Sequence, residues 1–553
     1  MKSTRALLTA VFLFVLPGCE EGPAGSSDAS DLETDTGSLL GSDGDTGTTP
    51  KNDPDSDTED SVESETGDTN SNEDTDIESG TDFYFDTDSN SGSRRDTSSA
   101  GPDSEVRDTA TTLVDSDLTE TDSHDTSGGS DAGVDSDSDG ELVGPEARQT
   151  DLLEIQISCD EEDMSLRCDN AASPCIPDEP KIMCRFEVHL DNGAVLYDGG
   201  AGIERRGRSS QMYDKPNYAL ELRLEDGETE NPVDFLDMGK ESDWILDGSW
   251  LDRAFMRNDL VFDTFRELGG VQHYAAESRY ATVALNGAPQ GVYRLVERIK
   301  KDDDRIDISD DDGSGSAFVI KQDEDGNLRD SFGMDHDVWQ LVYPKDTRAT
   351  QEQRDGVSAW LEAFSNAMRE GRPFDYLDPN TTVDFVLVQE LAKNRDAYYL
   401  SLHIFKDLEG PAHLVPWDID LSFGQPTLVN EPEVHNESPE GWITGRSVFI
   451  EDLCRDQRFA SLLGARWREL RGGPLSLEYL EARMETYLTM LTEDRMRENF
   501  AIWPIEEIEF EHIYAEYNIY DVGSFEEEVA ILRGWIADRL AWMDENIDSY
   551  PGE

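Results

Sequence analysis

The sequence has little positive charge: 46 lysines and arginines stand against 123 aspartates and glutamates, and the formal net charge is -77. Nucleic-acid binding requires a basic surface for the phosphates, so this balance argues against a nucleic-acid partner. The apolar run near the start, residues 6–16, is too short to cross a bilayer. Cysteine is scarce, with six residues that include no CxxC pair, and no histidine lies among the clustered ones. A structural zinc site is therefore not expected.

The cysteine spacing favours disulfide bonds over metal binding. Cys159, Cys168, Cys175 and Cys184 lie within 26 residues, and local disulfides are common in exported proteins. Two such bonds are predicted, but the pairing stays open because four cysteines allow three connectivities. Cys454 stands apart and is expected to be a buried thiol.

The N-terminus has the pattern of an export signal. Lys2 and Arg5 precede the apolar run, and Leu16-Pro-Gly-Cys19 closes it. This tetrapeptide resembles a bacterial lipobox, in which the cysteine becomes the lipidated first residue; an ordinary cleaved signal peptide is the alternative. Glu20 follows where an aspartate would indicate inner-membrane retention. We therefore expect residues 1–19 to be a lipoprotein signal peptide and Cys19 to anchor the protein in the bacterial cell envelope, at the outer membrane or cell surface.

Residues 20–150 are mostly Ser, Asp, Thr, Gly and Glu, with roughly 38 acidic and 5 basic residues. Like charges repel and few apolar side chains are available for burial, so a disordered, extended linker is predicted here. Such a linker would hold the folded remainder away from the membrane. Acidic tracts such as residues 135–140 lack the full EF-hand pattern, and specific calcium sites are not expected.

Residues 151–553 have ordinary aliphatic and aromatic content and are predicted to form one α+β domain, with its core at about 180–545. Alternating apolar and polar residues predict strands at 152–157, 183–190, 195–197, 215–224, 244–246, 280–285, 291–297 and 317–321. Helical spacing is found at 252–268, 348–370, 383–393 and through most of the chain after 449. A β-rich first half followed by a helix-rich second half indicates two lobes.

The residues that carry chemistry follow one another in the order of a protein kinase. A glycine-and-serine turn flanked by cations comes first, then a strand lysine, an Arg-Asp at a helix end, and Asp-Ile-Asp before Phe-Gly. Asp418 and Asp420 stand two positions apart on what reads as a short apolar strand, so both side chains should face one cation. In a kinase, the protein mainly positions the γ-phosphoryl group and neutralises its charge.

These motifs together resemble the CotH family, named for the spore coat protein H kinases. The matching segments are Arg206-Gly-Arg-Ser-Ser210 with Lys215, Asp252-Arg253 with Arg257-Asn258, residues 285–297, residues 318–321, Asn394-Arg-Asp396, and residues 416–424. The resemblance covers about residues 180–545. It implies an atypical protein-kinase-like fold that binds ATP with Mg²⁺ or Mn²⁺ and phosphorylates Ser or Thr of extracytoplasmic or surface proteins.

Carried over to this sequence, the resemblance implies that Asp396 orients or deprotonates the substrate hydroxyl. Asp418 and Asp420 would bind the metal ion, with Asp418 favoured as the direct ligand. Lys321 would contact the α- and β-phosphates and form an ion pair with Glu297. These side chains make up the predicted catalytic set.

Arg206, Arg208 and Ser209 would face the phosphates, because their turn offers cations and backbone N–H groups. Each assignment has a structural alternative. Asp396 would then pair with the neighbouring Arg395 at a helix end, and an aspartate of the metal pair would cap the following turn. Lys321 would lie exposed at the end of a strand, and the turn that carries Arg206 and Arg208 would be a solvated hairpin tip.

The sequence departs from the kinase pattern at Ser401. Kinase catalytic loops carry an asparagine five residues after the aspartate, where it helps to hold magnesium. Serine is a poorer ligand, and His403 prefers softer metals. Two functions follow: a surface-anchored kinase whose protein substrates include its own linker, or a catalytically inactive pseudokinase that acts as an adhesin or display protein.

Overall fold

The computed structural model describes residues 150–164, 175–322, 328, 339–398, 400–425, 437–443, 448–505, 511–512, 515–516 and 522–551. The predictions made for residues 1–149, which include the signal peptide, the lipid anchor at Cys19 and the linker, lie outside these ranges. Among the described helices, none combines the length and apolar character needed to cross a membrane.

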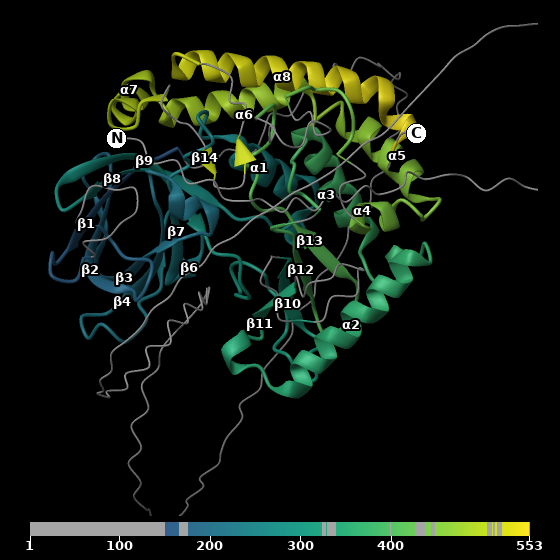
Figure 1. Ribbon diagram of the computed structural model, residues 1–553, viewed down its shortest axis with the longest axis horizontal. Helices are drawn as coiled ribbons and strands as arrows, with labels where there is room; N and C mark the ends of the chain where they lie inside the picture. The colour runs from purple at the N-terminus through teal and green to yellow at the C-terminus, as the bar shows by residue number, and fades with distance from the viewer. Residues whose placement is uncertain are drawn as a thin grey trace, which may run out of the picture. The chain divides into compact units, whose positions relative to one another are not determined.

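Seven strands in the first half of the folded chain form a closed barrel, coloured blue to teal in Figure 1. Their order is β1-β2-β3-β4-β7-β9-β8, and β1 closes the ring by pairing in parallel with β8. The strands are β1 Leu153–Cys159, β2 Ile182–Leu190, β3 Val195–Arg206, β4 Asn217–Arg223, β7 Asp243–Asp247, β8 Ser278–Leu285 and β9 Ala288–Glu297. Alternate residues of β1 are buried and the residues between them are exposed, which explains the pattern seen in the sequence.

A disulfide bond joins β1 to β2. It links Cys159 to Cys184, which lie opposite each other in the strand register. Cys175 is disulfide-bonded as well, whereas Cys168 lies outside the described residues. The prediction of disulfide bonds in this segment is thus confirmed for Cys159 and Cys184. Cys454 is a free thiol that is only half-buried, less than the sequence predicted.

A four-stranded antiparallel sheet with the order β11-β10-β12-β13 follows the barrel. Its strands are β10 Phe318–Gln322, β11 Trp339–Tyr343, β12 His403–Lys406 and β13 Ala412–Val415. Two short pairs complete the described strands: β5 Val233–Asp234 with β6 Lys240–Glu241, and β14 Glu511–His512 with β15 Ala515–Glu516. Because His403 pairs with Val415, the segments just before β12 and just after β13 lie side by side.

The helices are α1 Arg257–Gly269, α2 Gln351–Arg369, α3 Pro379–Ala392, α4 Val448–Leu453, α5 Phe459–Leu470, α6 Leu477–Met490, α7 Glu493–Ile502 and α8 Phe525–Asn546. The mostly apolar α3 lies at the centre, buried from Thr381 to Ala392 and packed against α1, α5, α8 and β13. Its start is set by Asp378, whose side chain accepts the backbone N–H groups of Asn380 and Thr381 in the first turn. In Figure 1, α6 and α8 run alongside each other across one side of this lobe.

The structure confirms an α+β fold with a β-rich first half and a helical second half. One predicted helix starts later than expected: α1 begins at Arg257 and not at Asp252. The Asp252 carboxylate accepts the N–H of Arg257 at 2.8 Å, and Phe255 has a φ of 59°. A left-handed residue interrupts a helix, so residues 252–256 form a turn in place of a helical start.

Candidate active site

Asp418 and Asp420 lie in a loop and not on the strand that the sequence predicted. β13 ends at Val415, and Pro416 has no N–H to continue the pairing. Asp418 has a φ of 62° and Phe423 a φ of 47°, left-handed values that a strand does not contain. Non-glycine residues with left-handed backbone angles are strained, and such strain is found most often at functional sites.

Two buried asparagines hold the backbone of this loop from opposite sides. Asn258, in the first turn of α1, accepts the N–H of Ile419 at 2.9 Å. Asn394, just after α3, donates its Nδ2 to the carbonyl oxygen of Asp418 at 3.2 Å. The loop is therefore fixed between α1 and α3 at the residue that carries the first carboxylate.

Arg257 holds the same loop further along the chain. Its Nε donates to the carbonyl oxygen of Ser422 at 3.2 Å, and its terminal nitrogens bond Asp252 at 2.6 Å and Glu528 at 2.8 Å. Arg253 also approaches Glu528, at 3.4 Å. Arg257 and Glu528 are fully buried, and buried charges require partners of this kind because desolvation is costly. Arg257 thus joins α1, the loop and α8 in one ionic network.

The carboxylates of Asp418 and Asp420 come together in this loop. The pKa of Asp420 is raised well above its ordinary value, first by its removal from water and then by the charge and hydrogen bond of Asp418. Asp247 and Asp252 add further negative charge. The hydroxyl of Ser401 donates to Oδ2 of Asp418 at 3.2 Å. Accumulated negative charge of this kind favours a bound cation.

The chemistry of this donor set fits a hard divalent cation whose other ligands come from outside the protein. Within the described ranges, no group of three or more His, Cys, Asp or Glu side chains is arranged to hold a metal ion. Mg²⁺ is commonly bound through one or two carboxylates, with waters and substrate phosphates completing the shell. Asp418 is exposed, so the pair can be reached from solvent, whereas Asp420 is the more buried of the two.

Asp396 lies in the turn after α3, and the side chain of Asn394 connects it to the loop. Its N–H donates to Oδ1 of Asn394 at 3.3 Å, and the same amide binds Asp418 through Nδ2. Lys393, which ends α3, has a φ of 49° and so turns the chain sharply toward this site. The backbone of Asp396 and the backbone of Asp418 are therefore bonded to the same asparagine side chain, and the roles of the two aspartates stay predictions.

Lys321 lies on the strand next to the segment that carries Ser401. The N–H of Ser401 donates to the carbonyl oxygen of Gln322 at 3.0 Å, and Gln322 returns its N–H to Leu402 at 2.7 Å. Lys321 is half-buried and lies opposite His403 in the register of β10 and β12. The backbone thus positions the predicted phosphate-binding lysine beside the segment that contacts Asp418.

Glu297 is not brought to Lys321. Its buried carboxylate accepts the hydroxyl of Tyr274 at 3.2 Å and the N–H of Glu277 at 2.9 Å, and Arg305 lies 3.9 Å away. Among the contacts of the described residues, no ion pair joins Glu297 to Lys321. The physical reason is topological: Glu297 ends β9 of the barrel, whereas Lys321 belongs to the separate four-stranded sheet.

The buried position of Glu297 predicts a pH-dependent contribution to stability. Burial raises the pKa of its carboxyl to about 7, so the folded state holds a proton that the unfolded state releases at lower pH. Stability contributed by this group is therefore present in acid and lost as the pH rises through about 7. Because glutamine mimics the protonated carboxyl, Glu297→Gln should gain about 2–3 kcal/mol relative to wild type between pH 5 and pH 8. Urea unfolding at both pH values measures this gain.

The matched control is Glu154→Gln, which removes a carboxylate from the exposed face of β1. Its unfolding free energy should follow that of the wild-type protein at both pH values. A Glu297→Gln protein with the same pH dependence as wild type would contradict the assignment.

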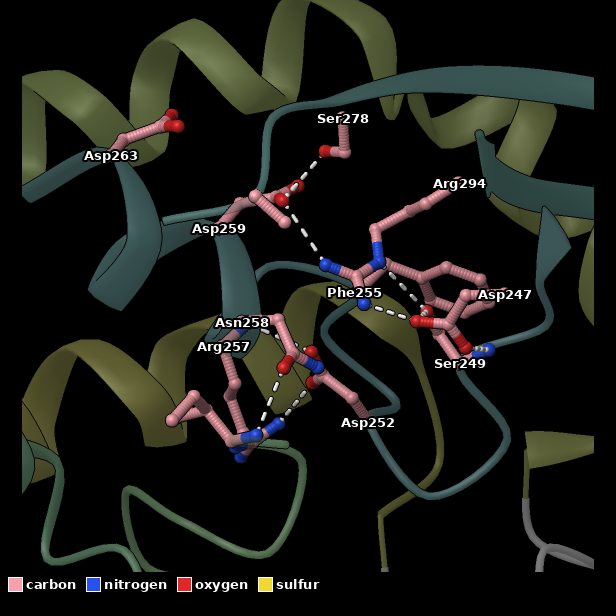
Figure 2. A network of polar contacts seen from close by, with 12 residues as sticks. Asp247, Ser249, Asp252, Phe255, Arg257, Asn258, Asp259, Asp263, Ser278 and Arg294 are labelled. Atoms are coloured by element: carbon pink, nitrogen blue, oxygen red, sulfur yellow. Dashed lines mark hydrogen bonds and ion pairs between the residues drawn. The ribbon is translucent and has the colours of Figure 1, made fainter. Parts of the chain in front are cut away.

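A second ionic network links the barrel to α1 (Figure 2). Arg294 of β9 pairs with Asp247 and, at 3.0 Å, with Asp259, which also accepts the hydroxyl of Ser278 at 2.7 Å. The Nε of Arg294 donates to Ser249 at 3.2 Å. Burial opposes ionisation of Asp247, but Arg294 keeps its pKa below the ordinary value. This network holds Asp247 in place on the barrel side of the carboxylate loop.

The predicted phosphate-facing turn lies at the end of β3. Arg206 is half-buried and contributes, after Arg294, to lowering the pKa of Asp247 against the effect of burial. Arg208 is exposed and precedes a short 3₁₀ helix, η1, that begins at Ser209, whose side chain is outside the described part of the structure. Arg206 is thus placed near the charges around Asp420, and the role of the turn in phosphate binding stays a prediction.

Four residues at this site had no assigned role in the sequence analysis: Arg257, Asn258, Asn394 and Glu528. Three of them lie within the motifs that carried the family resemblance, and that was the available signal. The sequence carried no such signal for Glu528, because an acidic residue in the first turn of a helix is ordinarily solvated and interacts with the helix dipole.

Comparison with known families agrees with this placement. Residues 203–543 match the family described as CotH kinase protein. The match begins in β3, ends in α8 and includes every residue described above at the candidate site. No curated protein matches the chain.

Proposed function

This chain belongs to the CotH kinase family, and on that basis we propose that it transfers the γ-phosphoryl group of ATP to Ser or Thr of proteins outside the cytoplasm. One observation carries the proposal. The carboxylates of Asp418 and Asp420 adjoin each other, and a single amide, Asn394, ties their loop to Asp396. Phosphoryl transfer needs carboxylates that hold a cation and a carboxylate that orients the attacking hydroxyl, and these three aspartates would supply both.

In this function, Asp418 and Asp420 would hold Mg²⁺ or Mn²⁺, and the bound cation would neutralise the phosphate charge. Asp396 orients the substrate hydroxyl and accepts its proton. Lys321 and Arg206 supply positive charge to the phosphates from the sheet and the barrel. Ser401 orients the Asp418 carboxylate through its hydroxyl, which substitutes for the missing asparagine.

The proposed location is the bacterial cell envelope. The lipobox-like segment would anchor the protein through a lipid on Cys19, and the acidic linker of residues 20–150 would carry the domain away from the membrane. The serines and threonines of that linker would be within reach of the domain, so the linker is itself a proposed substrate.

A second candidate is a pseudokinase that acts as an adhesin or display protein. The observation in its favour is that Ser401 occupies the usual asparagine position, where serine is a poorer ligand for magnesium. A protein of this kind would keep the fold without transferring phosphate.

Transfer of radiolabel from [γ-³²P]ATP by the full chain, with Mg²⁺ or Mn²⁺, tests the proposal. We expect label on serine or threonine of an envelope protein or of the linker, and Asp396→Asn should abolish the labelling while nucleotide binding persists. Labelling that survives in Asp396→Asn contradicts the catalytic assignment. Nucleotide-dependent thermal stabilisation without labelling supports the pseudokinase, and a protein that neither binds nor transfers contradicts the enzyme altogether.

A further inference from the structure

One face of helix α8 lies toward the segment that follows the candidate metal ligands Asp418 and Asp420. Glu528, Trp535 and Arg539 are spaced by seven and four residues, which places them on the same side of the helix. All three side chains are buried. Trp535 and Arg539 contact residues 423–441 directly, whereas Glu528 is connected to Ser422 through Arg257.

Glu528 acts at the start of this segment. It binds Arg257 at 2.8 Å, and Arg257 in turn donates to the carbonyl oxygen of Ser422, two residues after Asp420. Without the Glu528 carboxylate, the Arg257 guanidinium would keep its ion pair with Asp252 but lose the ion pair that ties it to α8. The position of Ser422 therefore depends on a residue that lies 271 positions from Arg257 in the sequence.

Trp535 acts further along the segment. Its ring packs edge-on against Phe423, with the centroids 5.9 Å apart. Gly424 has a φ of 83°, and a Cβ added there would lie 2.6 Å from Cδ1 of Trp535. The indole Nε1 also donates to the carbonyl oxygen of Glu437 at 3.0 Å. The loop thus ends against this indole, and only glycine allows the close approach.

Arg539 acts at the far end of the segment. Its guanidinium donates to the carbonyl oxygens of Pro439 at 2.7 Å and Gly441 at 2.6 Å. It also bonds the carbonyl oxygen of Glu390 on α3 at 2.9 Å, and Lys393 donates to Ser438 at 2.9 Å. The far end of the segment is consequently held by the same helix that holds its start.

From these contacts we infer that α8 is a positioning element for the Asp418–Asp420 loop and that Glu528 and Trp535 are positioning residues that set its affinity for the cation. The inference rests on the proposed function, since it requires a cation at these carboxylates. Neither residue touches the cation site itself. Both act through partners, Glu528 through Arg257 and Trp535 through Gly424, as outer-shell residues act on metal ligands.

Binding of Mn²⁺ to the full chain, followed by electron paramagnetic resonance, tests the inference. Glu528→Gln keeps the volume and a hydrogen-bond acceptor but removes the charge that holds Arg257. We expect about a tenfold loss of Mn²⁺ affinity, in the range that outer-shell substitutions cause. Excess Mn²⁺ should restore binding, whereas the affinity for ATP measured without metal should stay unchanged. The control is Asp538→Asn, which removes a charge from the exposed side of the same helix and should bind Mn²⁺ as wild type does.

Trp535→Phe provides a second variant that loses the Glu437 hydrogen bond and part of the packing against Gly424. Trp535→Phe should weaken Mn²⁺ binding by a smaller factor. If Glu528→Gln does not fold, this variant tests the positioning role of α8. Wild-type Mn²⁺ affinity in the folded variants overturns the positioning role. Absence of Mn²⁺ binding in the wild-type protein, or binding that Asp418→Asn leaves unchanged, overturns the proposed cation site and the inference with it.

Discussion

Replacing Asp418 by asparagine is expected to lower phosphoryl transfer at least about 100-fold, the scale on which enzymes lose rate when one preorganised electrostatic group is removed. The substitution preserves shape, so the Ser401 contact and the backbone bond from Asn394 can remain. What disappears is the negative charge that a divalent cation requires. Steady-state transfer from ATP, measured over a range of Mg²⁺ concentrations, reports the loss.

The matched control for this prediction is Glu409→Gln, which removes one exposed carboxylate from the turn between β12 and β13. It should leave transfer and its Mg²⁺ dependence unchanged. If Asp418→Asn retained wild-type activity at low Mg²⁺, Asp418 would not be a metal ligand.

Replacing Arg257 by methionine is expected to destabilise the folded protein by about 3–5 kcal/mol, as the loss of one partner from a buried ionic group does. The loss of stability arises from the partners of Arg257 that remain in the variant. The Asp252 carboxylate stays buried without its ion pair to Arg257, Glu528 keeps the 3.4 Å contact with Arg253 but loses the closer one, and Ser422 loses a donor to its carbonyl oxygen. Urea unfolding compared with wild type measures the difference.

Arg497→Met is the control, because Arg497 is an exposed arginine on α7 whose ion pairs within the described residues are with exposed acids. Exposed ion pairs of this kind contribute at most about 1 kcal/mol. Adding Asp252→Asn to Arg257→Met should recover part of the lost stability, since it removes the charge of a buried carboxylate whose ion pair with Arg257 is gone. A loss below about 1 kcal/mol for Arg257→Met would contradict the buried network.

Local patterns led to correct predictions where the structure depends on neighbouring residues. The hairpin of β8 and β9 follows from alternating residues on either side of Asn286-Gly287, and Asn286 has the left-handed φ of 48° that such a turn needs. The mostly apolar run of α3 likewise predicted a buried helix. In these elements, the side-chain period and the turn residues are sufficient because they act within a few positions.

Two departures from the predictions arise from distant contacts. The Asp418–Asp420 run reads as a strand, but Asn394 and Asn258 hold its backbone in a loop. The pairing of Glu297 with Lys321 followed from an analogy of motif order, whereas the barrel gives Glu297 to Tyr274, Glu277 and Arg305. Neither outcome can be derived from the residues next to these positions.

By itself, the sequence determined the family, the α+β class, and most of the strands and helices, and it supplied the acidic residues of the proposed cation site. These features follow from composition, short-range periodicity and motif order. Only the tertiary structure decided which residues hold the carboxylates in place. Arg257 bonds residues 5, 165 and 271 positions away in the chain. A buried charge must be paired with groups that lie close to it in the packed core, and these groups can be far from it in the sequence.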